Sequence, residues 1–483
     1  MKNKYIVAII LLLIISLGIF LRFYKFYPNV IFNGEMGTDY LRVWQMLHGG
    51  RTWLIGPSTS HEWFSISPLA YWIYGVVLSI GRWNPISINI FWGIISVLAI
   101  PITFYYVKKL FNQKIALISS FLLAVSPAWI IQARDARYNL VVSILFLPYL
   151  YYLKKSIEDK GKSLLKLGLI LGIMMSFFPS PILLIPAVVA SFLFFKVKPR
   201  FKYVLNLALG FLLPNITFFI YEIGNKFEIT IKLLSWVPYR ILGFFGLYQK
   251  NTVSSEIVGQ NIFSVYKYFG NIFGINNNII SIIILVLVMA GILIFIKKNI
   301  AKKRENASLF ILIISLIIFY LGLFVHGNPP SHYYYTIYII PLILISYFVD
   351  KIIKNKVLMA TFVLAVGGAC LCSLTAEKWF FQDTLAIDYQ TRAVSYSTQD
   401  KITDSIIEDS GVRPFYLRRI GPNDQFENNF ANNYIYLLLI RGRAVNNNSI
   451  TGYTIVEGKD NIKNLNGKII FSENDVFVFK NEI

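Results

Sequence analysis

The chain has 483 residues, of which 56% are hydrophobic, 16% aromatic and only 15% charged. This composition excludes an ordinary soluble protein and indicates a polytopic membrane protein. The formal net charge of +21 does not indicate a nucleic-acid partner, because the basic residues form short clusters between apolar segments. The two cysteines, Cys370 and Cys372, lie two positions apart in an apolar segment and face different sides of a helix, which argues against a disulfide framework and a zinc site.

The apolar segments predict about eleven transmembrane helices. The first, 5–21, lacks a small-residue cleavage site after it, so we expect an uncleaved anchor rather than a signal peptide. The others lie at 86–106, 115–131, 138–153, 167–178, 182–195, 203–221, 279–296, 307–325, 334–349 and 357–375. The pair 167–178 and 182–195 is short and separated by two prolines, so a half-inserted hairpin is an alternative there.

Basic residues occupy every second connection between these segments. The clusters lie at 2–4, 108–114, 154–166, 196–202, 297–304 and 351–356. The positive-inside rule places all of them in the cytoplasm. We therefore expect an integral protein of the cell (plasma) membrane with a cytoplasmic N-terminus and an extracytoplasmic C-terminal domain.

Two long connections face outward in this topology, at about 22–85 and 222–278. Each contains an apolar, aromatic segment that is too short to cross a membrane, at 68–80 and 236–248. We expect both segments to lie along the membrane surface, where they can cover a cavity.

The composition changes at Ala376, after which Asn, Asp and Lys are frequent. We predict a transmembrane domain over 1–375 and a small outward α/β domain over 376–483. The second is expected to contain a helix at 401–409, a β-type segment at 414–417 and a hairpin over 468–480. We find no nucleotide-binding glycine loop in the chain.

The first outer loop carries two carboxylates, Glu35 and Asp39, four positions apart among glycines in FNGEMGTDYLRVWQMLHGG. One interpretation makes one of them the acid/base group of a reaction, while the other tunes it or holds the substrate. The second interpretation makes Asp39 only the N-cap of a short helix over 40–48, which two glycines end.

Two further outer turns carry cations or imidazoles. In QARDARYN, Arg134 and Arg137 are candidate ligands of a phosphate, and the alternative is an ion pair with Asp135. In HGNPPSHYYY, His332 and Tyr333 are candidates for binding phosphate or sugar, and the alternative is an aromatic belt at the membrane interface. These groups come from separate loops that the topology places on one face, which suits a substrate with a charged headgroup and a lipid tail.

These segments together resemble the family 39 glycosyltransferases of the GT-C superfamily, relatives of protein O-mannosyltransferases and lipid A aminoarabinose transferases. The resemblance rests on GEMGTDYLRVWQML, on LIGPSTSHEWFSISPLAYWIYG, on QARDARYN and on HYYYTIYIIPLIL, and it covers about 1–375. It implies a mainly α, GT-C type bundle and adds His61, in the second of these segments, as a candidate for substrate binding.

The resemblance also implies a function: inverting transfer of a sugar from a polyprenyl-phosphate donor to an acceptor hydroxyl of a glycan, lipid or protein. An acidic residue of the first loop is the base in that family. Members of the family carry adjacent acidic residues there, whereas Met36 follows Glu35 here, so either Glu35 or Asp39 is a candidate for the role. No cofactor is expected with certainty, and a divalent metal held by both carboxylates is an alternative.

Two other functions compete with the transferase. A flippase or transporter of lipid-linked sugars predicts ionisable residues near the bilayer midplane and internal repeats, and the apolar segments show few charges and no clear repeat. A non-catalytic component of a glycan assembly complex predicts that Glu35 and Asp39 are dispensable.

Overall fold

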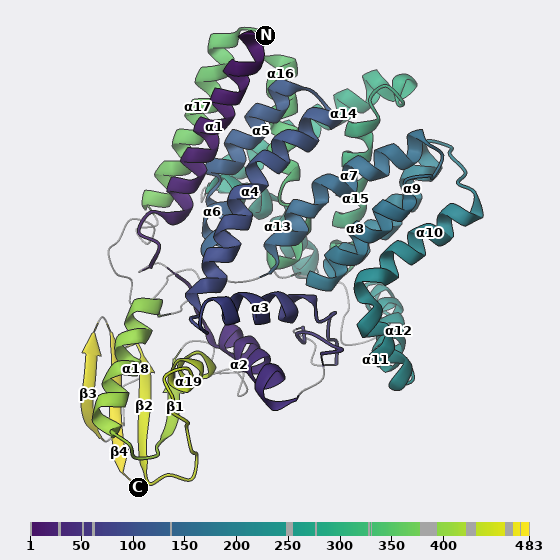
Figure 1. Ribbon diagram of the computed structural model, residues 1–483. Coiled ribbons are helices and arrows are strands. Elements are labelled where there is room, and N and C mark those ends of the chain that lie inside the picture. The colour runs from purple at the N-terminus through teal and green to yellow at the C-terminus, as the bar shows by residue number, and fades with distance from the viewer. Residues whose placement is uncertain are drawn as a thin grey trace.

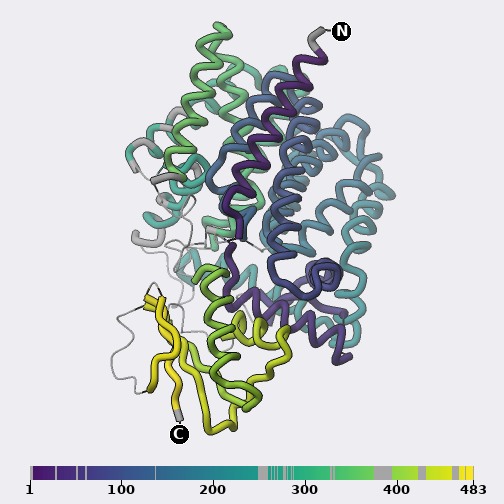
Figure 2. Tube along the Cα trace, turned by 60° about the vertical axis from the view of Figure 1, so that its left-hand side comes forward, coloured from purple at the N-terminus to yellow at the C-terminus, as the bar shows by residue number. Residues whose placement is uncertain are grey.

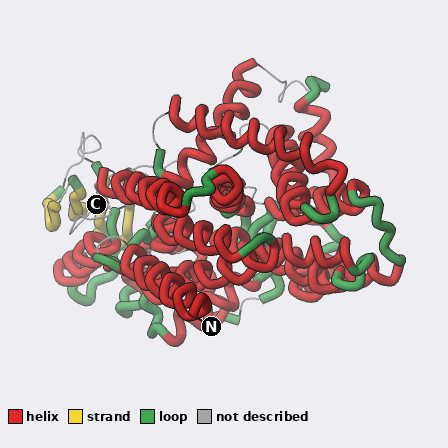
Figure 3. The backbone as a smooth tube through the Cα atoms, turned by 90° about the horizontal axis from the view of Figure 1, so that it is seen from above, coloured by secondary structure: helices red, strands yellow, loops and turns green. Residues whose placement is uncertain are grey.

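The protein is described by a computed structural model, which defines residues 2–27, 30–50, 53–59, 63–135, 138–247, 255–275, 278–326, 329, 331–376, 394–421, 431–458, 467–473 and 475–482. Helices fill most of the molecule, and the strands lie together on one side (Figures 1 and 3). Within the described ranges, seven helices are long and apolar enough to cross a membrane, and a bent pair can form an eighth span. The predicted polytopic helical bundle is confirmed.

The long helices are α1 (Lys2–Phe23), α4 (Ile86–Leu110), α7 (Leu140–Glu158), α10 (Phe201–Leu212) continued by α11 (Ile216–Gly224), α14 (Asn278–Asn299), α15 (Ala307–His326) and α17 (Lys356–Ala376). The bent pair is α5 (Gln113–Val125) and α6 (Pro127–Arg134), which meet at 54°. The bend lies at Pro127, which has no N–H to continue the hydrogen bonding of α5.

Three of the predicted spans are short helices. They are α8 (Leu164–Phe177), α9 (Leu184–Phe194) and α16 (Ile340–Ile352), and the last follows the 3₁₀ segment η6 (Ser331–Ile337). Each of the eleven predicted segments contains a helix, but these three are shorter than 18 residues, so the number of full spans is seven or eight by length. The shortness of α8 and α9 was predicted.

The basic connections between these helices meet at one end of the bundle. Lys303 donates a hydrogen bond to the carbonyl of Phe194, and Ser308 donates one to the carbonyl of Leu110. Lys114 lies 4.0 Å from Asp350 in a third contact of this kind. The N-terminus and the C-terminal strands lie at opposite ends of the molecule (Figure 1). This arrangement supports the alternation of basic and outer connections, and the sidedness in the membrane stays a prediction.

Single cysteines test that sidedness. In a background with Cys370 and Cys372 replaced by Ala, we expect Asn447→Cys to react with an impermeant maleimide in intact cells. Lys302→Cys should react only after permeabilisation, because both positions are exposed in the fold but lie in oppositely assigned segments. Reaction of both residues from the same side would contradict the topology.

Two helical segments lie outside the spans at the outer end, where the sequence predicts surface segments. Helix α3 (Leu69–Ile80) crosses below the bundle (Figure 1). Helix α12 (Glu228–Phe244) begins earlier than the predicted 236–248, because the buried Glu222 carboxylate accepts hydrogen bonds from the N–H groups of Ile229 and Thr230 at 3.3 and 2.7 Å. These contacts cap the start of the helix. Helix α13 (Ser255–Phe273) follows it.

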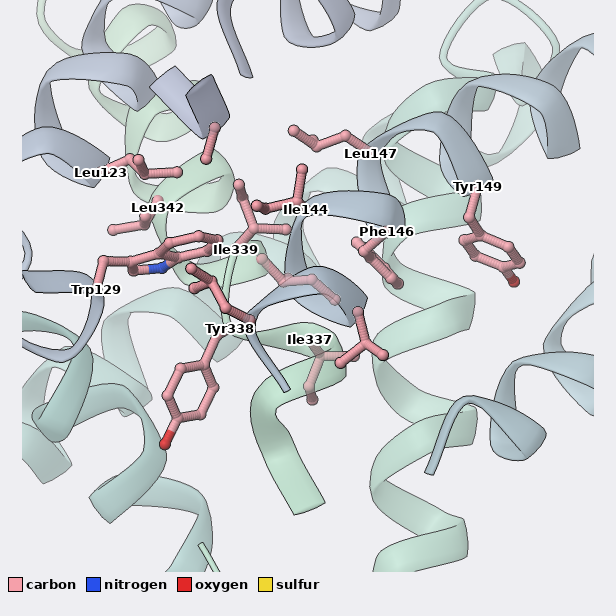
Figure 4. Packing of buried hydrophobic residues seen from close by; sticks show 14 of the residues in the cluster. Leu123, Trp129, Ile144, Phe146, Leu147, Tyr149, Ile337, Tyr338, Ile339 and Leu342 are labelled. Carbon is pink, nitrogen blue, oxygen red and sulfur yellow. The ribbon is translucent and has the colours of Figure 1, made fainter. Parts of the chain in front are cut away.

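The apolar core joins the halves of the bundle. Trp129 of α6, Ile144 of α7 and Ile339, between η6 and α16, are buried in one cluster (Figure 4). At the polar edge of this region, the Ser143 hydroxyl donates to the carbonyl of Tyr335. The chain near η6 is thereby fixed against the helices that follow the first outer loop.

The C-terminal part is a small α/β unit at the end opposite the N-terminus (Figure 2). It contains α18 (Tyr396–Ser410), β1 (Tyr416–Ile420), α19 (Asn432–Leu439), β2 (Thr451–Glu457), β3 (Lys468–Glu473) and β4 (Val476–Glu482). The sheet order is β1-β2-β4-β3, with β1 parallel to β2 and the other neighbours antiparallel. The predicted helix and hairpin are confirmed, as is the α/β character, whereas β2 and α19 were missed. The boundary at 376 stays a prediction.

A buried ion pair ties the first two strands of this unit together. Arg419 of β1 donates to both carboxylate oxygens of Glu457 on β2, and its Nε lies 2.9 Å from Oε1. The Tyr434 hydroxyl of α19 donates to the same Oε1 at 2.9 Å. The carboxylate is thus satisfied inside the apolar core.

Candidate active site

Helix α2 (Gly34–Gly49) carries both predicted carboxylates. Its N-cap is Asn33, whose side-chain oxygen accepts a hydrogen bond from the N–H of Met36 at 3.1 Å. Gly50 ends the helix in the left-handed conformation with φ of 66°, as the glycine pair predicts. The interpretation of Asp39 as the N-cap is therefore wrong, because the helix begins earlier and Asp39 lies in its second turn.

The Asp39 carboxylate accepts a hydrogen bond from a neighbouring helix, and Arg42 extends this contact to the loop between the two helices. The hydroxyl of Tyr71, on α3, donates to Asp39 Oδ1 at 2.8 Å. Arg42, one turn further along α2, donates to the Tyr71 hydroxyl and to the hydroxyl of Ser58, both at 3.3 Å. A carboxylate, a phenol, a guanidinium and a serine hydroxyl are thus brought together from three parts of the first outer loop.

Burial raises the pKa of the Asp39 carboxyl from 3.8 to about 7. The Tyr71 hydroxyl and the Arg42 charge oppose this rise, and the nearby charge of Glu35 adds to it. Burial also keeps the pKa of Tyr71 well above its ordinary value, so the phenol stays protonated and can donate. An acid whose pKa lies near neutrality is suited to proton transfer at physiological pH.

Glu35 lies one helical turn before Asp39 and is exposed to solvent. Within the residues that the structure describes, no group of three or more His, Cys, Asp or Glu side chains is arranged to hold a metal ion. Two carboxylates alone do not establish a metal site, and a metal held by Glu35 and Asp39 stays a prediction.

Arg134, a predicted phosphate ligand, is fully buried at the end of α6. Its guanidinium donates to the carbonyls of Leu21 at 3.3 Å, Tyr24 at 2.5 Å and Lys25 at 3.5 Å. Leu21 lies in the last turn of α1, and Tyr24 and Lys25 lie in the turn that directly follows it, where no further helical turn satisfies the carbonyls. The structure thus shows Arg134 as a cap of α1, and its contact with a phosphate stays a prediction.

Arg134 bonds the end of α1, and Arg22 of α1 in turn bonds the end of α5. This fully buried residue of α1 donates to the carbonyls of Leu123 at 3.2 Å and Ala124 at 3.0 Å, at the end of α5. Its Nε donates to Ser96 Oγ at 2.7 Å. An arginine inside a membrane span marks a functional site by default. Here the guanidinium instead bonds carbonyls at the end of α5, next to the bend between α5 and α6.

His332 and Tyr333 lie in η6, in a second cluster. The ring centroid of Phe178, in the turn after α8, lies 5.9 Å from the ring centroids of both residues. The ring centroids of Tyr333 and His326 are 5.3 Å apart. Trp236 of α12 lies 5.6 Å from His326. The structure thus joins these residues to the second long outer connection, and their binding role stays a prediction. Arg137 and His61, the remaining predicted residues, lie outside the described part of the chain.

The sequence interpretation missed Arg42, Tyr71 and Ser58. Arg42 could have been found, because it lies three residues after Asp39 and so on the same face of a helix. Tyr71 is one aromatic residue in an apolar segment, and only the crossing of α2 and α3 gives it a special position.

Comparison with known proteins supports the resemblance. Residues 65–221 match a family model described as dolichyl-phosphate-mannose-protein mannosyltransferase. This match begins before α3 and ends in α11. The search of curated proteins finds no match.

Structural similarity to solved structures identifies the fold. The crystal structure of ArnT from Cupriavidus metallidurans bound to undecaprenyl phosphate is similar over 97% of both chains, with a TM-score of 0.59 at 10% identity. The chain has the GT-C fold. The apo form of that ArnT gives a TM-score of 0.58 at 11% identity. The apo oligosaccharyltransferase of Archaeoglobus fulgidus gives 0.52 at 14% identity, over 85% of this chain and 59% of that one. The predicted GT-C type fold is confirmed.

Proposed function

We propose that the chain is a membrane glycosyltransferase that moves a sugar from a polyprenyl-phosphate carrier to an acceptor hydroxyl at the extracytoplasmic face. The GT-C fold and the match to a mannosyltransferase family model support transfer from a lipid-linked donor. A similar structure contains undecaprenyl phosphate, and this supports a polyprenyl carrier. The observation that carries the proposal is the Asp39 carboxyl, which has a pKa near 7 and lies beside Tyr71 and Arg42.

Asp39 is the base in this proposal. The ionised carboxylate takes the proton of the acceptor hydroxyl while the hydroxyl oxygen attacks the anomeric carbon, and the bond from that carbon to the phosphate oxygen breaks. The configuration inverts because one displacement occurs. Glu35 is exposed to solvent, whereas Asp39 is partly enclosed and accepts a hydrogen bond from Tyr71, so we assign the role of the base to Asp39.

Arg42 is the cation for the leaving phosphate. The lipid phosphate departs as a stable anion and needs electrostatic stabilisation rather than a general acid. Both contacts of the Arg42 guanidinium, to Ser58 and Tyr71, are 3.3 Å long, beyond the usual range for N–H···O bonds. The guanidinium can therefore exchange these two weak hydrogen bonds for bonds to a phosphate oxygen at a small cost in free energy.

The proposal is tested by reconstitution. Purified protein is added to membranes of source cells that lack its gene, together with one polyprenyl-phosphate hexose or pentose at a time from a radiolabelled panel. We expect one donor to transfer label to an extractable glycan, lipid or protein with release of polyprenyl phosphate. Label that crosses sealed vesicles without transfer would instead support a flippase.

Tyr71→Phe tests the environment of the base. The hydroxyl of Tyr71 favours the ionised form of Asp39, so its loss should raise the pKa of Asp39 further above 7. We expect the acid limb of the rate profile to move to higher pH, with most of the loss at pH 6 and near recovery at pH 9. Tyr105→Phe, at an exposed position on α4, is the control and should leave the limb unchanged. An unmoved limb in Tyr71→Phe would contradict the assignment of Asp39 as the titrating group.

A further inference from the structure

We propose that the C-terminal α/β unit is part of the catalytic machinery, because α19 docks on α2 at Gly37 and fixes the position of Asp39. Gly37, Thr38 and Asn432 are positioning residues in this inference, which rests on the proposed function. Three independent sets of contacts carry it.

The first is a close approach of two backbones. A Cβ atom on Gly37 would lie 2.3 Å from the backbone N of Asn433 and 2.4 and 2.5 Å from the carbonyl C and O of Asn432. Backbone atoms cannot move aside as a flexible side chain can. Only glycine therefore allows α19 to lie this close to α2. At Gly49, at the other end of α2, a Cβ would meet nothing within 4 Å.

The second set is polar. The Asn432 amide donates to Thr38 Oγ1 at 2.8 Å, and the Thr38 hydroxyl donates to the carbonyl of Gly34 at 2.8 Å. Gln399 of α18 donates to the carbonyl of Phe32, just before α2, at 2.6 Å, and accepts from Asn433 at 2.8 Å. Both the first turns of α2 and the chain that enters them are thus bonded to the C-terminal unit.

The third set is aromatic. Tyr436 of α19 lies edge-on to Phe32 and Tyr40, with ring centroids 6.0 and 5.5 Å apart, and its hydroxyl donates to the carbonyl of Trp83 at 2.7 Å. Tyr40 directly follows Asp39 and is fully buried. The side chain of Tyr40 therefore sets the rotation of α2 about its axis.

These contacts act on Asp39 through the helix. Two residues of an α-helix turn by roughly 200°, so Asp39 projects from nearly the opposite face to Gly37. A helix of 16 residues with internal glycines has little stability alone. With α19 on one face and α3 on the other, α2 can present the carboxylate in one position. A displacement of about 1 Å in a reacting group costs on the order of 100-fold in rate.

The test compares Gly37→Ala with Gly49→Ala in the full-length protein in nanodiscs, using the donor that the panel identifies. We expect Gly37→Ala to lower kcat by about 100-fold while KM for the donor changes less than about twofold, and to increase amide hydrogen exchange in α2. Gly49→Ala should match wild type in both measurements. Increased exchange with an unchanged kcat would overturn the proposal.

Thr38 supplies a second pair in case Gly37→Ala does not fold. Thr38→Val removes the hydroxyl at nearly constant volume, and Thr38→Ser keeps it. We expect Thr38→Val to lower kcat at constant donor KM and Thr38→Ser to restore it. Equal kcat in both would overturn the positioning role. Failure of the proposed function has a different signature: the wild-type protein transfers no label from any donor of the panel. Wild-type transfer by Asp39→Asn would instead remove Asp39 from the role of the base.

Discussion

We expect the replacement of Asp39 by Asn to slow sugar transfer severely while the protein stays folded. The amide has nearly the shape of the carboxylate and can still accept from Tyr71, but it cannot take a proton from the acceptor. Loss of a general base lowers the rate by about 10² to 10⁴-fold. We therefore expect transfer to fall by this factor, with donor binding close to that of wild type. Glu35→Gln is the matched control, and a severe loss there with little loss at Asp39 would move the base to Glu35.

The same substitution has an opposite effect on stability. The pKa of Asp39 is raised from 3.8 to about 7 in the folded protein, so folding favours the protonated carboxyl. This contribution is complete below about pH 4 and is lost as the pH rises through 7. Asp39→Asn removes this charge and should therefore unfold at a higher temperature than wild type at pH 8, with a smaller difference at pH 5 and almost none below about pH 4. A lower midpoint at pH 8 would contradict the burial of this charge.

Replacing Arg134 by Ala destabilises the protein. The guanidinium holds three carbonyls at the end of α1 in a buried site, and each unsatisfied carbonyl costs about 1 to 3 kcal/mol. We expect a loss of about 3 kcal/mol or more, seen as a lower thermal midpoint in detergent. Arg200→Ala, at an exposed position, should not change the midpoint. Equal midpoints together with weak donor binding by Arg134→Ala would favour the predicted phosphate contact instead.

The bundle was predictable from the sequence because apolar length and basic clusters are properties of each segment alone. The bend between α5 and α6 was not predicted, although Pro127 is a local signal for it. The apolar pattern also does not show that the predicted span 334–349 is divided between η6 and the short α16. In the C-terminal unit, the hairpin of β3 and β4 is local and was found. Strand β2, TGYTIVE, is rich in β-branched and aromatic residues and was missed although this local pattern favours a strand. Helix α19 has only eight residues and is held by packing on α2.

The site divides in a similar way. The sequence placed Glu35 and Asp39 in one loop, but the interpretation of that loop missed Asn33, whose side chain caps α2 by accepting from the N–H of Met36. Arg134 appeared as a surface cation because the sequence does not show that it turns inward to cap α1. Arg42 and Tyr71 acquire their relation to Asp39 only from the crossing of α2 and α3.

The competing functions make different predictions for these residues. A flippase needs ionisable groups along a path through the bilayer, and the buried Arg22 and Arg134 are instead bonded to helix ends. A non-catalytic component needs neither carboxylate. Near-normal cellular glycosylation with both Asp39→Asn and Glu35→Gln in one chain would favour either of these over the transferase.

The most direct test of Asp39 as the base is a single-turnover measurement with prebound donor. Wild type and Asp39→Asn are loaded with the same amount of labelled polyprenyl-phosphate sugar and mixed with saturating acceptor membranes, so that the rate reports the chemical step rather than donor binding or product release. Asp39 as the base predicts equal loading and a chemical step slower by about 10² to 10⁴-fold in Asp39→Asn. Equal loading with an unchanged rate of the chemical step would contradict it.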